Sequence, residues 1–170
     1  MLTGPEEART PDLCNAIATL SQLSYGPVPT NYIAYPPILE VAFLLGLGML
    51  IGVGTDIVEI NRIKKLLNKF PGFPSKILNP EEFRPFMTPE YLAGRWAAKE
   101  AVVKAMGVGI GNQCTFKDIL ILNDELGRPI VSLRGKADQL ATSLAHGVYS
   151  IHLSISHDSY VVAFCVLAKI

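Results

Sequence analysis

The sequence is poor in charged residues and has no excess of either sign. Lys, Arg, Asp and Glu make up 18% of its 170 residues, and 15 basic side chains balance 15 acidic ones. Nucleic-acid-binding domains usually carry a clustered basic excess, so we expect no nucleic-acid partner. The charges are nevertheless uneven, because residues 1–48 contain a single base, Arg9, and the remainder therefore carries a modest basic excess.

Cysteine is scarce, and no apolar stretch has the features of a membrane span. The three cysteines form no CxxC pair and no metal-ligand spacing, which argues against a disulfide framework or a zinc site. We expect small buried thiols in a reducing, cytoplasmic compartment. The apolar stretch 41–54 is shorter than the ~20 residues of a transmembrane helix, so we expect no membrane association.

The first 48 residues differ in character from the rest. They are interrupted by Pro, Gly, Ser and Thr and show little periodicity, which is typical of disordered arms or linkers. Met49, by contrast, leads directly into an apolar run that would suit a buried first strand. We therefore predict that residues 1–48 are a disordered or mis-annotated N-terminal extension and that residues 49–170 form the functional domain.

The clearest single element is a helix predicted at residues 89–106. Thr88 suits the N-cap, and Pro89 suits the first helical position. Gly107 is a natural C-terminal stop. Several alanines give this helix small side chains on part of its surface, so we expect the backbone of another element to pack closely against it.

The remaining pattern predicts an α+β domain. Strands are expected at 50–56, 116–122, 129–133, 149–156 and 160–167, and further helices at 57–70 and 136–145. The strand at 160–167 is apolar throughout, so we expect it to be buried on both faces. A domain of about 120 residues with few helices cannot cover such a sheet alone, and we expect a homo-oligomer to cover it.

The helix predicted at 57–70 has one apolar and one basic side. Arg62, Lys65 and Lys69 fall together on the side opposite the apolar residues. They form either an ordinary solvated face or a docking surface for an acidic partner, and the sequence alone leaves both open.

A small set of polar residues suggests phosphate chemistry. Asp56 is expected at a strand end, Glu100 and Lys104 one turn apart on the long helix, and His157 at a tight turn. Two carboxylates brought together repel unless a cation lies between them, and oxygen ligands favour Mg²⁺ completed by water and phosphate. Metal-assisted attack on a phosphate ester or anhydride would follow. The alternative for Glu100 and Lys104 is a surface ion pair.

Two segments resemble the signatures of the holo-acyl-carrier-protein synthases, the small type of 4′-phosphopantetheinyl transferase. They are GTDIVEINR at 54–62 and YLAGRWAAKEAVVK at 91–104. Residues 107–111, 127–129 and 154–157 resemble further landmarks of this family. The resemblance covers about residues 50–170, and the first 48 residues have no counterpart.

The resemblance implies a 4′-phosphopantetheinyl transferase fold, a mainly antiparallel sheet packed against a long helix, assembled as a homotrimer. It also implies Mg²⁺-dependent transfer of 4′-phosphopantetheine from coenzyme A to a serine of apo acyl carrier protein, with release of 3′,5′-ADP. Asp56 and Glu100 would hold the Mg²⁺, and Lys104 would neutralise the diphosphate. The other implied contacts are Arg95, Gly107 and His157 to coenzyme A, and Arg62, Lys65 and Lys69 to the acidic carrier protein.

Other interpretations remain open. The domain could bind carrier protein or coenzyme A without transferring anything, or it could be a Mg²⁺-dependent nucleotide-diphosphate hydrolase. Lys99 could simply solvate the helix surface, and His157 could be a core histidine. We expect Trp96 to pack in the core, and Glu59 and Asp158 to lie at the surface.

Overall fold

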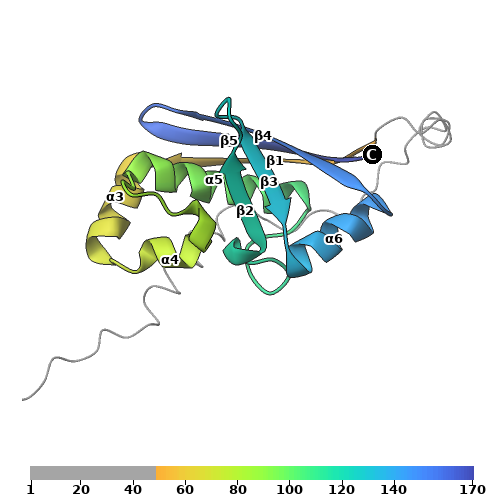
Figure 1. The fold of residues 1–170 in the computed structure, drawn as a ribbon, viewed down its shortest axis with the longest axis horizontal. Helices are drawn as coiled ribbons and strands as arrows, with labels where there is room; N and C mark the ends of the chain where they lie inside the picture. The colour runs from red at the N-terminus through yellow and green to blue at the C-terminus, as the bar shows by residue number, and fades with distance from the viewer. Residues whose placement is uncertain (1–48) are drawn as a thin grey trace, which may run out of the picture. The chain divides into compact units, whose positions relative to one another are not determined.

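The structure is a computed structural model that describes residues 49–170, so the predicted extension at 1–48 lies outside the described residues. Its elements are β1 (Leu50–Glu59), α3 (Ile60–Lys69), α4 (Phe73–Ile77), η2 (Pro80–Glu82), α5 (Pro89–Ala105), η3 (Phe116–Asp118), β2 (Ile119–Asn123), β3 (Pro129–Leu133), α6 (Gly135–Ala145), β4 (Tyr149–His157) and β5 (Tyr160–Lys169) (Figure 1). Within this part of the chain, no helix has both the length and the apolar character needed to cross a membrane.

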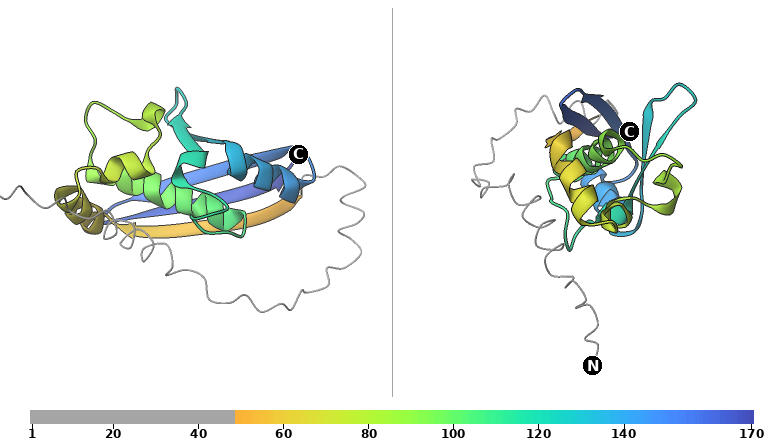
Figure 2. Two further views of the ribbon diagram at one scale, coloured as in Figure 1. Left: turned by 90° about the horizontal axis from the view of Figure 1, so that it is seen from below. Right: turned by 90° about the vertical axis from the view of Figure 1, so that its left-hand side faces the viewer.

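The strands form two antiparallel sheets. The larger has the order β1-β5-β4, and the smaller pairs β2 with β3. Helix α5 lies along one face of the larger sheet (Figure 2). This arrangement confirms the predicted α+β class, with a mainly antiparallel sheet packed against one long helix.

Helix α5 begins and ends close to where its sequence predicts. The Thr88 hydroxyl accepts a hydrogen bond from the Tyr91 N–H at 3.2 Å, and Gly107 after the helix has a φ of +73°. Trp96 packs in the core as expected, with its ring 5.7 Å from that of Phe73 and 4.9 Å from that of Phe116.

Strand β1 approaches α5 so closely that main-chain atoms make the contact. A Cβ added at Gly54 would lie 1.9 Å from the Ala101 carbonyl oxygen and 2.5 Å from the Ala105 nitrogen. At Gly52 it would lie 2.1 Å from the Ala105 carbonyl oxygen. Only glycine fits at such a contact. The expected close approach to the alanines of α5 is therefore present, and Asp56 follows directly along the strand.

The boundary between β1 and α3 differs from the prediction. The strand continues to Glu59, so Asp56 lies within the strand and not at its end, and the helix begins at Ile60. The reason is pairing with β5: Val58 lies opposite Val161, and Glu59 opposite Tyr160. A ladder between β-branched residues outweighs the helical periodicity that begins at residue 57.

A second boundary is displaced near residue 116. The predicted strand starts only at Ile119, because η3 precedes it. Both the backbone N–H and the hydroxyl of Thr115 donate to the Asp118 carboxylate at 2.7 Å, which stabilises the turn.

Burial of β5 on both faces is wrong for the single chain. Val161, Ala163 and Cys165 are buried beneath α5, but the alternate residues face outwards, and Phe164 is 48% exposed. Val53 and Ile57 of β1 are exposed beside them. The difference arises because no described element covers this side of the sheet, which we call the outer face.

Candidate active site

The centre of the candidate site is the contact between β1 and α5. Lys104 donates a hydrogen bond from Nζ to Oδ1 of Asp56 at 2.8 Å, and both side chains are largely buried. Burial raises the pKa of Asp56 above its ordinary value, although Lys104 acts in the opposite direction. The lysine thus pairs with the strand carboxylate and not with Glu100.

Glu100 lies close enough to Asp56 for the two carboxylates to repel. It is only 3% exposed, and its Oε1 has no hydrogen-bond partner among the described residues. Burial, and then the Asp56 charge, raise the pKa of Glu100 to about 7. The reading of Glu100 and Lys104 as a surface ion pair is therefore wrong, because a buried carboxylate lacks a partner.

This donor set fits a hard divalent cation. An unpartnered buried carboxylate oxygen is costly, and a bound cation would relieve that cost together with the repulsion between the two acids. Residues 49–170 contain no group of three or more His, Cys, Asp or Glu side chains that could hold a metal. Asp56 and Glu100 alone would leave most positions to water and phosphate oxygens, which is how Mg²⁺ commonly binds.

A concave region lies at the other side of α5. It is a cleft of about 530 Å³ between the start of α5, the β2–β3 hairpin and the end of β4. Its polar lining includes Arg84, Glu90, Tyr91, Arg95, Asn123 and His157. Arg95 and His157, which the family resemblance implied as coenzyme A contacts, therefore meet in one cleft. His157 is exposed, so the core-histidine interpretation is wrong.

Two arginines converge inside the cleft. The guanidinium carbons of Arg84 and Arg95 lie 4.3 and 4.8 Å from the centre of the Tyr91 ring. Both arginines donate to Oδ1 of Asn123, at 3.1 Å and 2.6 Å. We did not expect Arg84 or Asn123 from the sequence, because they come from two segments that carry no common motif. Tyr91 begins the signature at 91–104 but was not among the predicted contacts.

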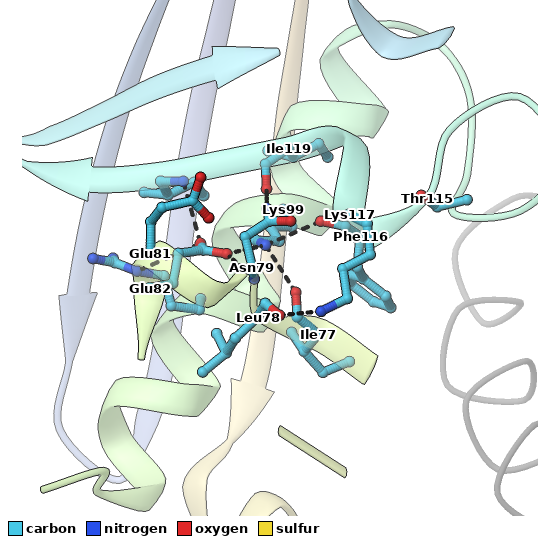
Figure 3. Close-up of polar contacts among 12 residues, drawn as sticks. Ile77, Leu78, Asn79, Glu81, Glu82, Lys99, Thr115, Phe116, Lys117 and Ile119 are labelled. Carbon is cyan, nitrogen blue, oxygen red and sulfur yellow. Dashed lines mark hydrogen bonds and ion pairs between the residues drawn. The ribbon is translucent and has the colours of Figure 1, made fainter. Parts of the chain in front are cut away.

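Lys99 is fully buried, so the interpretation that it solvates the helix surface is wrong. Its ammonium donates to Glu82 Oε2 at 2.6 Å and to the carbonyls of Ile77 and Phe116 at 2.8 and 3.0 Å (Figure 3). These bonds use all three donors of the group. Desolvation lowers the pKa of Lys99 to about 8, although Glu82 acts in the opposite direction.

Glu82 connects this buried pair to the neighbouring segments. Its carboxylate accepts hydrogen bonds from the backbone N–H groups of Asn79 at 2.7 Å and Ile121 at 3.2 Å. The pair therefore joins α5 to η2 and β2, beneath the cleft.

Arg62 lies near enough to Asp56 for its charge to oppose the rise in the pKa of that carboxyl. Arg62, Lys65 and Lys69 are exposed on α3, opposite buried Ile60 and Ile63. The Gly107 N–H donates to the Lys104 carbonyl at 2.9 Å, so here it caps α5. Glu59 and Asp158 are exposed, as expected.

The two halves of the candidate site face different sides of α5. At 3.6 residues per turn, Arg95 lies about 140° around the helix from Glu100 and about 180° from Lys104. The strands agree, because Asp56 is on β1 and His157 on β4, with β5 between them.

Comparisons with a family model and with curated proteins point to the same family. Residues 52–165 match the model of the 4′-phosphopantetheinyl transferase superfamily. The holo-[acyl-carrier-protein] synthase of Clostridium novyi is 48% identical over 64% of this chain and 80% of its own length. The corresponding synthase of Natranaerobius thermophilus is 51% identical over 64% of this chain and 89% of its own length.

A solved structure has the same fold. The holo-(acyl-carrier-protein) synthase of Bacillus anthracis in complex with CoA (3′,5′-ADP) superposes with a TM-score of 0.59 and 38% identity. The match covers 72% of this chain and 99% of that one. The signature helix, the antiparallel sheet and these relatives agree, and the chain belongs to the 4′-phosphopantetheinyl transferase superfamily, within the family of the holo-[acyl-carrier-protein] synthases.

Proposed function

We propose that this chain transfers 4′-phosphopantetheine from coenzyme A to a serine of apo acyl carrier protein, in a reaction that depends on Mg²⁺. The observation that carries the proposal is the unpartnered Oε1 of buried Glu100 beside the Asp56–Lys104 pair. The names of the relatives, which are holo-[acyl-carrier-protein] synthases, support the same substrates. A cytoplasmic location stays a prediction.

The reaction is a phosphoryl transfer. The serine hydroxyl oxygen forms a bond to the phosphorus that carries the pantetheine, and the bond from this phosphorus to the bridging oxygen breaks. The hydroxyl proton passes to water, and 3′,5′-ADP leaves with the bridging oxygen. When bound by Asp56 and Glu100, Mg²⁺ would neutralise charge on the diphosphate. Lys104 adds a positive charge beside the same place.

Mass spectrometry of apo acyl carrier protein tests the proposed function. Incubation with the enzyme, coenzyme A and Mg²⁺ should add one phosphopantetheine group, about 340 Da, and omission of the metal should prevent it. Binding of coenzyme A without any mass gain would favour a binding module. Release of 3′,5′-ADP in the absence of carrier protein would favour a hydrolase.

The basic face of α3 is proposed to dock the acidic carrier protein. Its three exposed cations, Arg62, Lys65 and Lys69, support this role through charge complementarity. We expect Lys65→Glu to raise the KM for carrier protein about tenfold, with the KM for coenzyme A unchanged. Lys136→Glu, an exposed lysine on α6, is the matched control. Equal effects of the two variants would contradict the docking surface.

A homotrimer with sites between protomers is proposed as the working assembly. The exposed apolar residues of the outer face support association, because such a patch is uncommon on a monomer. The two halves of the candidate site point to opposite sides of α5, which supports a site completed by a second copy. In such an assembly one protomer supplies Asp56, Glu100 and Lys104, and its neighbour supplies the cleft.

A complementation experiment separates shared sites from sites within one chain. Asp56→Asn and Arg95→Gln are each expected to be nearly inactive. Co-expressed with different affinity tags and purified through both, they should recover about a third of wild-type activity, since every trimer that contains both variants has one of its three sites built from two intact halves. Mixed oligomers that stay as inactive as the parents would place each complete site within one protomer.

A further inference from the structure

We propose that Lys99 is a positioning residue for the carboxylate of Glu100. From inside the core, its ammonium holds α5 in the rotation about the helix axis that keeps Glu100 beside Asp56. This inference rests on the proposed function, because it concerns the two carboxylates that would hold Mg²⁺.

The contact between β1 and α5 sets their separation but does little to set the rotation of the helix. Gly52 and Gly54 present no side chain to α5, so this part of the strand has no knob that could lock into a groove of the helix. The apolar side chains that pack on α5 add contacts that are not directional. The direction of Glu100 therefore depends on a further point of attachment.

Lys99 supplies that attachment. Its Nζ donates to Glu82 Oε2 at 2.6 Å and to the carbonyls of Ile77 and Phe116 at 2.8 and 3.0 Å (Figure 3). Three acceptors on three short segments fix the ammonium in all directions. The side chains of Lys99 and Glu82 have no exposed surface, so solvent does not compete for these bonds.

The acceptors are themselves held in place. The Glu82 carboxylate accepts from the backbone N–H groups of Asn79 at 2.7 Å and Ile121 at 3.2 Å. Nδ2 of Asn79 donates to the Ile119 carbonyl at 2.8 Å. These bonds tie the segment around η2 to β2, which belongs to the smaller sheet. Lys99 is thus anchored to a part of the fold other than the sheet that carries Asp56.

The two attachments lie on roughly opposite sides of α5. At 3.6 residues per turn, Ala101 and Ala105, which touch β1, lie about 160° and 120° around the helix from Lys99. Glu100 lies about 100° from Lys99, on the arc between the two attachments. A helix held from both sides cannot turn without breaking one contact, so the bonds of Lys99 set the direction of the next side chain in the chain.

Stability alone does not account for this buried pair. Apolar residues of similar size are often as stable as a buried ion pair, whereas removal of one partner is costly. The double variant Glu82→Gln with Lys99→Met removes both charges together and therefore separates the two roles. If the pair only stabilises the fold, a folded double variant keeps its metal affinity. If the pair positions Glu100, metal affinity falls while the Tm does not.

Calorimetric titration of the intact enzyme with Mg²⁺ tests the inference. We expect the double variant to raise the Kd of Mg²⁺ about tenfold and to lower kcat by a similar factor, as loss of a residue that supports a metal ligand commonly does. Its Tm should stay close to that of the wild type. Glu82→Asp, which keeps both charges but shortens the carboxylate by one methylene group, should act in the same direction by a smaller factor. This milder variant decides the question if the double variant does not fold.

Tyr149→Phe is the control for a loss of stability alone. It removes the 2.5 Å hydrogen bond from the Tyr149 hydroxyl to Asp138, which joins β4 to α6 and lies outside the Lys99 network. We expect this variant to lower the Tm and to leave the Kd of Mg²⁺ unchanged.

Three results would overturn the inference. They are an unchanged Kd of Mg²⁺ in the folded variants, a loss of metal affinity that appears only with a fall in Tm, and an equal loss in Tyr149→Phe. Mass spectrometry of carrier protein keeps the proposed function separate. A wild-type enzyme that modifies carrier protein with Mg²⁺ retains the proposed function even if the double variant behaves like the wild type. A wild-type enzyme that binds no Mg²⁺ overturns both.

Discussion

Asp56→Asn is expected to lower kcat/KM for phosphopantetheine transfer by about 10³-fold or more, since a catalytic metal supplies several kcal/mol of transition-state stabilisation. The substitution keeps the size of the side chain but removes the charge that Lys104 now contacts at 2.8 Å. It also removes one of the causes that raise the pKa of Glu100, so that the remaining carboxylate becomes easier to ionise. The loss should therefore come from the metal site and not from unfolding.

Glu59→Gln is the matched control for this experiment. Glu59 ends the same strand and is exposed, so its variant should keep the wild-type rate. Mg²⁺ titration monitored by calorimetry gives a second readout, in which Asp56→Asn and Glu100→Gln should both weaken binding of the metal. Full activity in both variants would remove this pair of carboxylates from the chemistry.

Lys99→Met is expected to destabilise the protein by about 3–5 kcal/mol, the usual cost of leaving one partner of a buried ion pair alone. Glu82 would keep its two backbone hydrogen bonds but lose the ammonium 2.6 Å away. The double variant Glu82→Gln with Lys99→Met removes both charges and should recover most of that loss. Urea denaturation at pH 7 measures the free energy of unfolding of the wild type and of both variants.

The control for the buried pair is its neighbour in sequence. Glu81 is exposed and pairs with Arg134 at 2.9 Å, so Glu81→Gln should lower the free energy of unfolding far less than Lys99→Met does. If Lys99→Met were as mild as Glu81→Gln, the buried network would not hold α5 to η2 and β2.

The long helix could be predicted from the sequence because its signals are local. A cap, a proline and a glycine stop lie within or beside the element that they delimit. The alanines of α5 also predicted that another backbone would approach this helix, although the sequence did not identify β1 as that backbone. The start of α3 could not be predicted in this way, because pairing with a strand about 100 residues away decides where β1 ends.

The site was predicted unevenly for the same reason. Asp56, Glu100 and Lys104 belong to contiguous motifs, and the structure brings them together. Lys99 belongs to one of these motifs, but its burial depends on pairing with Glu82. Nothing in the sequence around Glu82 indicates that it pairs with Lys99. The contacts of Asn123 could not be predicted either, since its two arginine partners come from a loop and a helix that are distant in sequence.

The main-chain contact between β1 and α5 has a consequence for how the protein tolerates change. Because Gly52 and Gly54 touch the backbone of Ala101 and Ala105, the separation of the strand from the helix does not depend on the volume of any intervening side chain. Substitutions around Trp96 can alter how well the core is packed and still leave the two carboxylates at the same spacing. Substitutions elsewhere in the hydrophobic core can therefore accumulate without moving the residues of the site.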